Sequence, residues 1–195
     1  IEGYKLRTGK MLNNDWKRFD QAVSQLSNAK LYIDDTPGIT IGEIRAKCRR
    51  LSSSSDGLDL VIIDYLQLIS GGKNYGANRQ QEVADISRSL KTLAMELHIP
   101  VIALAQLSRS VEGREDKRPM LSDLRESGSI EQDADLVGFL YRDDYYNKEA
   151  KNDATSISEF IIAKHRNGPQ ATIQLLFKKD TSTFLNMSKQ ESEDE

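Results

Sequence analysis

Two polar side chains stand at the ends of apolar runs, where buried strands of a sheet would stop. Asp64 ends LDLVIID, residues 58–64, and Gln106 ends VIALAQ, residues 101–106. In open α/β sheets ligands gather at the carboxyl ends of the strands. A carboxylate there can hold a hydrated Mg²⁺ ion beside phosphates, and an amide can bond a water or a phosphate oxygen. Each side chain alone is also explained by capping a turn, but the two together favour a function.

Two cations follow a later apolar run. Lys164 and Arg166 lie in AKHRNGP, residues 163–169, and side chains two apart on a strand point the same way. Gly168 and Pro169 then turn the chain. Two cations at a hairpin tip can grip phosphates, and an arginine supplied to a neighbour's nucleotide is an arginine finger. The spacing alone also fits a solvated basic turn, so both interpretations stay open.

A long polar stretch covers residues 107–129 and contains Arg125, Glu126 and Gly128. Long polar loops in compact domains are usually functional or mobile. Backbone N–H groups around Gly128, together with Arg125, can track a phosphate backbone. A loop in which Ser129 caps a short helix explains the same residues, so this alternative also stays open.

Apolar periodicity predicts the elements that position these residues. Helical spacing predicts helices over 13–26, 41–51 and 79–97. Asn13 or Asn14 is expected to cap the first helix, and Thr40 with Glu43 forms a capping box before the second. Apolar runs predict buried strands at 31–34, 58–64, 101–106 and 135–142, and an antiparallel pair at 157–164 and 171–177. This order indicates an α/β fold with a largely parallel twisted sheet, helices on both faces and an antiparallel end.

The composition fits a globular domain without a membrane span. The 195 residues are 38% hydrophobic and 29% charged, with a net charge of −3. Any nucleic-acid contact must therefore come from local basic groups. The single cysteine, Cys48, fits a reducing compartment, here the cytoplasm. Residues 1–187 are expected to form one partial domain and 188–195 a disordered acidic tail, and the start at Ile1 suggests a piece of a longer protein.

The chain resembles the C-terminal RecA-like motor domain of the DnaB-type replicative DNA helicases. The resemblance covers nearly the whole chain and rests on several long motifs in one order. They are LRTGKM, YIDDTPGI, IRAKCRRL, VIIDYLQLI, NRQQEVADISRSLK, PVIALAQLSRSVE, DKRPMLSDLRESGSIEQDAD, FLYRDDYYN and IAKHRNGP. It implies a RecA-like P-loop NTPase core, ATP and Mg²⁺ as cofactors, and a homo-hexamer that moves 5′ to 3′ on single-stranded DNA and unwinds duplex DNA. A primase and a helicase loader are the implied partners.

The resemblance also implies roles for the residues singled out above. Asp64 corresponds to the Walker B aspartate that holds the metal, and Gln106 to the glutamine that couples the γ-phosphate to the DNA-binding loops. Arg166 resembles the arginine finger that reaches the ATP of the adjacent subunit, with Lys164 beside it on the same phosphates. The loop that holds single-stranded DNA in the channel of the ring is matched by Arg125, Glu126 and Gly128.

The sequence departs from the family pattern in two places. No G-x-x-x-x-G-K-[ST] occurs in the 195 residues, so the N-terminal part of the motor domain is missing and this chain alone is expected not to hydrolyse ATP. His165 stands where the family commonly has glutamine, and little consequence is expected because it faces away from the two cations. Two alternatives remain: another RecA-like ATPase, or a non-enzymatic domain that binds a partner.

Overall fold

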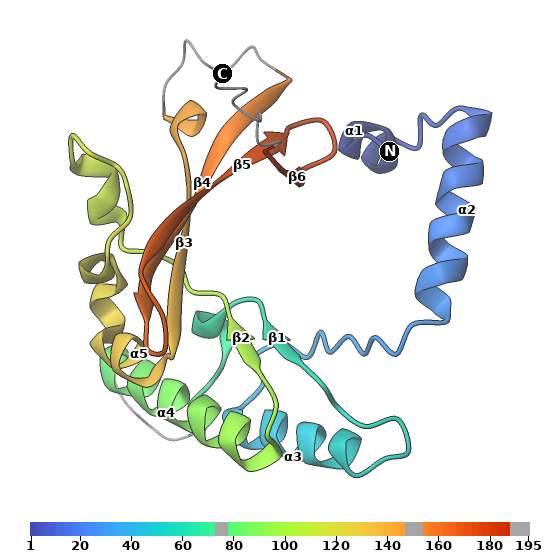
Figure 1. The fold of residues 1–195 in the computed structure, drawn as a ribbon. Helices are drawn as coiled ribbons and strands as arrows, with labels where there is room; N and C mark the ends of the chain where they lie inside the picture. Colours follow the sequence, from blue (N-terminus) through green and yellow to red (C-terminus); the bar gives the residue numbers. More distant parts are fainter. Residues whose placement is uncertain (73–77, 147–153, 188–195) are drawn as a thin grey trace, which may run out of the picture. The chain divides into compact units, whose positions relative to one another are not determined.

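The computed structural model describes residues 1–72, 78–146 and 154–187, without the side chains of residues 125–127. The predicted acidic tail, 188–195, lies outside the described residues. The α-helices are α1 (Gly3–Thr8), α2 (Asn13–Ser27), α3 (Ile41–Ser52), α4 (Arg79–Leu97) and α5 (Gly128–Asp133) (Figure 1). The strands are β1 (Val61–Ile63), β2 (Val101–Ala103), β3 (Leu136–Arg142), β4 (Thr155–His165), β5 (Ala171–Lys178) and β6 (Thr183–Asn186). Short 3-10 helices are η1 (Leu66–Leu68), η2 (Arg109–Gly113), η3 (Leu121–Ser127) and η4 (Asp143–Tyr145).

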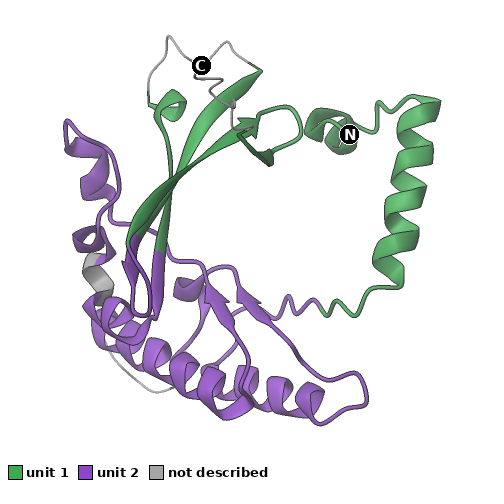
Figure 2. Cartoon of the chain, in the orientation of Figure 1, with its two compact units in different colours: residues 1–32, 138–162, 170–195 green, residues 33–137, 163–169 purple. Residues whose placement is uncertain are grey.

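The chain forms two compact units (Figure 2). One comprises residues 1–32, 138–162 and 170–195, and the other comprises residues 33–137 and 163–169. All of the candidate residues from the sequence lie in the second unit. None of the described helices is long and apolar enough to cross a membrane.

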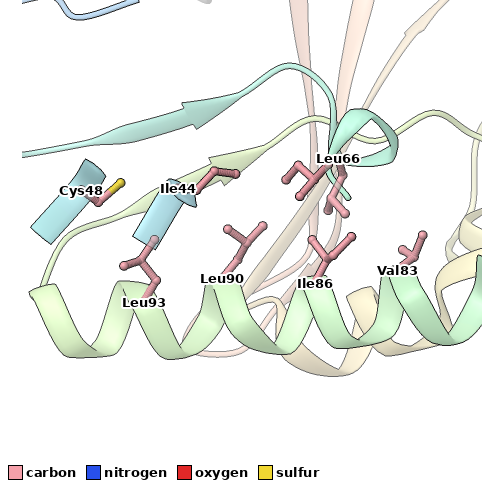
Figure 3. Packing of buried hydrophobic residues seen from close by; sticks show 8 residues of the cluster. Ile44, Cys48, Leu66, Val83, Ile86, Leu90 and Leu93 are labelled. Carbon is pink, nitrogen blue, oxygen red and sulfur yellow. The ribbon is translucent and has the colours of Figure 1, made fainter. Parts of the chain in front are cut away.

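The second unit is built on the apolar stripe of α4. The stripe residues Val83, Ile86, Leu90 and Leu93 are buried, and they face Ile44 and Cys48 of α3 and Leu66 of η1 (Figure 3). The predicted capping box starts α3, because Thr40 Oγ1 accepts from the Glu43 N–H while the Glu43 carboxylate accepts from the Thr40 N–H. Both helices were predicted from apolar spacing, and both predictions are confirmed.

The parallel part of the fold is the β1–β2 pair. Val61 lies opposite Val101 and Ile63 opposite Ala103, as expected for parallel strands connected through a helix. Val61, Ile63 and Val101 pack against the α3–α4 core. The expectation that both faces of these strands are covered is wrong for this chain, because the other face exposes large apolar side chains. They are Leu60, Ile62, Ile102 and Leu104.

The remaining strands form a second sheet in the order β3-β4-β5-β6. The predicted antiparallel pair is confirmed, with Phe160 opposite Ile173, and β6 extends it by a strand that the sequence reading missed. The predicted strand at 135–142 forms as β3 but belongs to this sheet rather than to the parallel pair. A Cβ at Gly138 of β3 would lie 2.5 Å from the Phe160 ring, so any larger residue there would force that ring to move. The α/β fold with parallel pairing and an antiparallel end is thus confirmed.

Two local predictions are wrong. Residues 31–34 form no strand, and Ile33 is 85% exposed, because among the described residues no strand lies alongside them to complete a β-ladder. Helix α2 is capped by Leu12 rather than by Asn13 or Asn14. The Asp15 carboxylate accepts a hydrogen bond from the Leu12 N–H, and the helix begins at Asn13, one residue earlier than an Asn13 cap and two earlier than an Asn14 cap would place it.

Candidate functional site

Asp64 and Gln106 follow neighbouring parallel strands. The β1–β2 pairing continues beyond the strands, since the Leu104 N–H donates to the Ile63 carbonyl and the Leu66 N–H to the Leu104 carbonyl, each at 2.9 Å. Both candidate side chains are exposed at this edge. The expectation that they end adjacent strands at one edge of a sheet is confirmed.

The Asp64 carboxylate suits a hydrated metal ion. Within the described part of the chain no hydrogen bond or ion pair engages it, so its oxygens are available to outside groups. No cluster of three or more acidic, histidine or cysteine side chains that could enclose a metal occurs among the described residues. A single exposed carboxylate fits Mg²⁺ in a nucleotide site, because that ion keeps several waters and takes other ligands from substrate phosphates.

Gln67 fixes the backbone at Gln106. The Gln106 N–H donates to Gln67 Oε1 at 3.2 Å, and Gln67 Nε2 donates to the Gln106 carbonyl at 3.3 Å. One side-chain amide thus pairs with both backbone groups of Gln106, as a neighbouring strand would. The side chain of Gln106 stays exposed and takes no part in this pair. Sequence reasoning missed Gln67, although it stands only three residues after Asp64.

The segment after Asp64 is tied to the start of α4. Arg79 Nη2 donates to the Gln67 carbonyl at 2.6 Å, and its other terminal nitrogen pairs with Glu82. The Glu82 carboxylate also accepts from the Gly71 N–H at 2.8 Å. This backbone bond, followed by Arg79, lowers the pKa of Glu82, while desolvation opposes them. Gln67 is therefore held by a charged network rooted in the core helix.

Lys164 and Arg166 both reach the carboxyl end of α5. Lys164 Nζ donates to the carbonyl oxygens of Glu131 and Gln132. Arg166 Nη2 donates to the Gln132 carbonyl at 3.1 Å, and its Nη1 lies 3.3 Å from the Asp135 carboxylate. The expectation that the two cations point the same way is confirmed. Carbonyls at a helix end carry partial negative charge, which favours cations there.

Asp135 joins these cations to the core helix. Its carboxylate accepts from Lys91 Nζ of α4 at 2.5 Å and pairs with Arg166. The hydrogen bond from Lys91 is the main cause that lowers the pKa of Asp135, and burial opposes it. Sequence reasoning missed this residue, because nothing in its position before β3 indicates partners 44 residues upstream and 31 downstream in the chain.

His165, between the two cations, packs on the turn. Its imidazole occupies the space beside Gly168, where a Cβ would lie 2.4 Å from the ring. A larger residue at 168 would therefore force the ring to move, and the ring makes none of the α5 contacts made by Lys164 and Arg166.

Gly128 begins α5. It is exposed, a Cβ would meet nothing within 4 Å, and its φ of −51° is ordinary for any residue. Neither packing nor backbone geometry in the described chain requires a glycine there. Ser129 lies inside this short helix rather than capping it. The side chains of the two other DNA-binding candidates, Arg125 and Glu126, lie outside what the structure describes.

The polar stretch before Gly128 folds around Asp123. This carboxylate is 3% exposed and forms a two-pronged pair with Arg114, at 3.0 and 2.8 Å. It also accepts from the Met120 N–H, and the Asp123 carbonyl accepts from the Ser108 N–H. The stretch that connects Gln106 to the start of α5 is thus ordered by the ion pair between Arg114 and the buried Asp123.

The candidate residues form two groups within the second unit. Asp64 and Gln106 stand at the edge of the parallel pair, and Lys164 with Arg166 stands at the end of α5. Among the described residues no hydrogen bond or ion pair links one group to the other. The geometry suits two separate faces, each with charged or polar groups available to a phosphate.

The sequence and fold match one helicase family. Residues 1–186 match the family described as DnaB-like helicase C terminal domain. The chain is 61% identical over 189 residues to "Replicative DNA helicase DnaB" of Geobacillus stearothermophilus, covering 97% of this chain and 41% of that protein. It is 59% identical to "Replicative DNA helicase DnaC" of Bacillus subtilis (strain 168), with the same coverage of 97% and 41%. The chain therefore spans about two fifths of these relatives, 41% in both.

Solved structures give the same result. One structure, described as an ATPase domain, is 44% identical with a TM-score of 0.87, over 96% of this chain and 66% of that one. A structure of a DnaB-like replicative helicase, described with its interactions with primase, is 44% identical with a TM-score of 0.88, over 96% of this chain and 46% of that one. Both neighbours support an α/β helicase ATPase fold for the chain.

Proposed function

The chain belongs to the family of DnaB-like helicase C-terminal domains, and we propose that it is part of the motor of a hexameric, ATP-dependent replicative DNA helicase. This helicase moves 5′ to 3′ on single-stranded DNA in the cytoplasm and works with a primase and a helicase loader. The observation that carries the proposal is the placement of Asp64 and Gln106, exposed at the ends of adjacent parallel strands. That edge is where ligands bind in such sheets.

Each residue group takes one task in ATP hydrolysis. The Asp64 carboxylate holds the waters of a Mg²⁺ ion, which when bound neutralises charge on the phosphate oxygens of ATP. Gln106 donates from its amide to the γ-phosphate or its attacking water, while its backbone is fixed by Gln67. Lys164 and Arg166, held at the end of α5, present two positive charges to the ATP of the adjacent subunit.

DNA is held by a different part of the same unit. Gly128 at the start of α5, with Arg125 and Glu126 before it, contacts the backbone of single-stranded DNA. The bare Cα of Gly128 supports this role, since the described chain gives no internal reason for glycine there. A ring of such loops reconciles DNA binding with a net charge of −3, because only the loops meet the phosphates.

The 195 residues by themselves are proposed to be inactive. They contain no phosphate-binding loop of the G-x-x-x-x-G-K-[ST] type, whose lysine and hydroxyl supply much of the phosphate grip. Mg²⁺-dependent turnover by the purified 195-residue chain, above that of an Asp64→Asn variant, would contradict this. Such a chain would instead be a complete ATPase of another design.

Hydrolysis between subunits is tested in the intact protein with two variants. Arg166→Ala removes the finger and Asp64→Asn removes the metal ligand, so each alone should lose at least about 10³-fold in kcat. Co-expressed, they form rings in which some sites combine an intact Asp64 with a neighbour's intact Arg166, and activity should reappear. Arg50→Ala, an exposed arginine of α3, is the matched control and should behave as wild type.

Three results would each contradict the proposal or part of it. Normal hydrolysis by Arg166→Ala would remove the finger role. Inactive variants that stay inactive when co-expressed in mixed rings would place both residues in one subunit's site rather than across an interface. If the intact protein hydrolyses no ATP at all, the partner-binding alternative takes its place.

A further inference from the structure

Asp135 stands between a core helix and the proposed finger. Its carboxylate contacts Lys91 Nζ at 2.5 Å on one oxygen and Arg166 Nη1 at 3.3 Å on the other. Its backbone carbonyl accepts from the Arg166 N–H at 2.8 Å. One residue thus holds both the backbone and the guanidinium of Arg166, and Lys91 restrains that residue in turn.

Stability does not account for this arrangement. The side chains of Asp135 and Arg166 are 55% and 49% exposed, and exposed ion pairs contribute little to folding because water screens them. The contacts are instead explained by the need to orient the Arg166 guanidinium. A free arginine samples many rotamers, whereas one anchored at two nitrogens presents its remaining donors in a fixed direction. The exposure also leaves Arg166 accessible to a neighbouring molecule.

We propose that Asp135 is a positioning residue for the arginine finger, and that Lys91 fixes Asp135 to α4. This rests on the finger role of Arg166 proposed above. In the ring, Arg166 Nη1 stays paired with the Asp135 carboxylate. Arg166 Nη2 leaves the Gln132 carbonyl and donates instead to the γ-phosphate bound by the adjacent subunit. Because α5 supplies that carbonyl and begins at Gly128, the finger is held by the same short helix that follows the DNA-binding loop.

The proposal predicts a loss in kcat without a loss in ATP affinity. The finger stabilises charge in the transition state, so misplacing it slows the chemical step more than it weakens binding in the ground state. In the intact protein, Asp135→Ala should lower the DNA-stimulated kcat at least about 10-fold with KM nearly unchanged. Asp135→Glu keeps the charge and should recover part of the loss, and Lys91→Met should give a smaller loss of the same kind.

Rings that contain two different variants distinguish a misplaced arginine finger from a general defect in folding. Asp135→Ala leaves its own Asp64 intact, so co-expression with Asp64→Asn should restore activity, as for Arg166→Ala. Co-expression with Arg166→Ala should not, since both variants then lack a working finger. The matched control is Asp59→Asn, an exposed aspartate before β1, which should retain wild-type kcat in unmixed rings.

The outcomes distinguish this proposal from the one it rests on. If Arg166→Ala hydrolyses ATP normally, the finger role and the positioning role both fail. If Arg166→Ala is inactive while Asp135→Ala matches Asp59→Asn, only the positioning role fails. It also fails if Asp135→Ala raises KM with kcat unchanged, or if Asp64→Asn does not rescue it, because either result places its effect outside the finger.

Discussion

Gln67 and Gln106 form a reciprocal pair across the edge of the parallel strands. The side-chain amide of Gln67 accepts from the N–H of Gln106 and donates to its carbonyl, at 3.2 and 3.3 Å. Gln67 is itself tied through its carbonyl to Arg79 of α4. A glutamine proposed to sense the γ-phosphate therefore has a backbone that cannot shift without moving the segment after Asp64. The two catalytic candidates are linked through this pair.

Because of this pair, we expect Gln67 to affect the coupling of ATP hydrolysis to DNA binding rather than the binding of the nucleotide. Gln67→Met keeps the length of the side chain and removes both hydrogen bonds, which costs about 1–2 kcal/mol of local stability. In the intact protein, stimulation of ATP hydrolysis by single-stranded DNA should fall several-fold, while the Kd for ATP stays the same. Gln67→Glu keeps only the acceptor and should give a comparable loss. Full stimulation in Gln67→Met would show that the pair is structural only.

A substitution at Gly128 is expected to weaken DNA binding without lowering the stability of the fold. A Cβ at this position meets nothing in the chain, and alanine favours helix more than glycine does. The free energy of unfolding of Gly128→Ala should therefore stay unchanged or rise by up to about 1 kcal/mol. If DNA packs against the bare Cα, the Kd for single-stranded DNA should rise by roughly tenfold, about 1.4 kcal/mol.

The control for this prediction lies in the same polar stretch. Gly113 also has open space around it, so Gly113→Ala matches the substitution without touching the start of α5. Binding of a labelled single-stranded oligonucleotide, followed by fluorescence anisotropy at one fixed salt concentration, gives both Kd values. Equal affinities for the two variants would remove Gly128 from the DNA contact.

Local patterns in the sequence were sufficient for most of the long elements and for the strand-end residues. The stripe Val83, Ile86, Leu90 and Leu93 predicted α4 because the same spacing that sets the pattern also sets which side is buried. Asp64 and Gln106 were found because a polar residue that ends an apolar run marks the edge of a sheet. The strand predicted at 31–34 failed because apolar content does not provide a pairing partner.

Long-range polar partners could not be predicted in this way. Asp135 meets Lys91 and Arg166 only because α4, the residue before β3 and the residue after β4 come together within the second unit, and no spacing within one element encodes that meeting. The same holds for Arg114 and Asp123, which look like ordinary charges of a polar loop until the fold buries one of them. The roles of Lys164 and Arg166 came from the family resemblance, since their spacing alone also fitted a solvated turn.

Replacing Asp123 is expected to destabilise the polar stretch of residues 107–129. Its buried carboxylate is bonded by Arg114 and by the Met120 N–H, so Asp123→Ala leaves the Arg114 guanidinium without this counter-ion and the Met120 N–H without this acceptor. The expected cost is about 2–4 kcal/mol in unfolding free energy, measured by urea denaturation. Asp123→Asn keeps an acceptor and should cost less. A loss below about 0.5 kcal/mol for Asp123→Ala would mean that the pair does not order the stretch.

Asp34 predicts a loss of stability in acid. Hydrogen bonds from the Lys47 ammonium first, and then from the Thr36 hydroxyl and N–H, lower the pKa of Asp34 from 3.8 to about 2. A carboxylate whose pKa is lowered by folding stabilises the native state above its unfolded pKa, and this contribution disappears as the pH falls through the folded pKa. The contribution should thus be complete well above pH 3.8 and be lost as the pH falls through 3.8 toward 2.

The comparison of wild type with Asp34→Asn tests that window. The asparagine cannot titrate, so the difference in unfolding free energy between the two proteins should be constant from pH 7 to about pH 5 and shrink as the pH falls further. Because the pair is exposed, the difference should also decrease when salt is added, since ions screen the attraction between Asp34 and Lys47. A difference that does not change with pH would show that Asp34 is not held ionised by these partners in the folded protein.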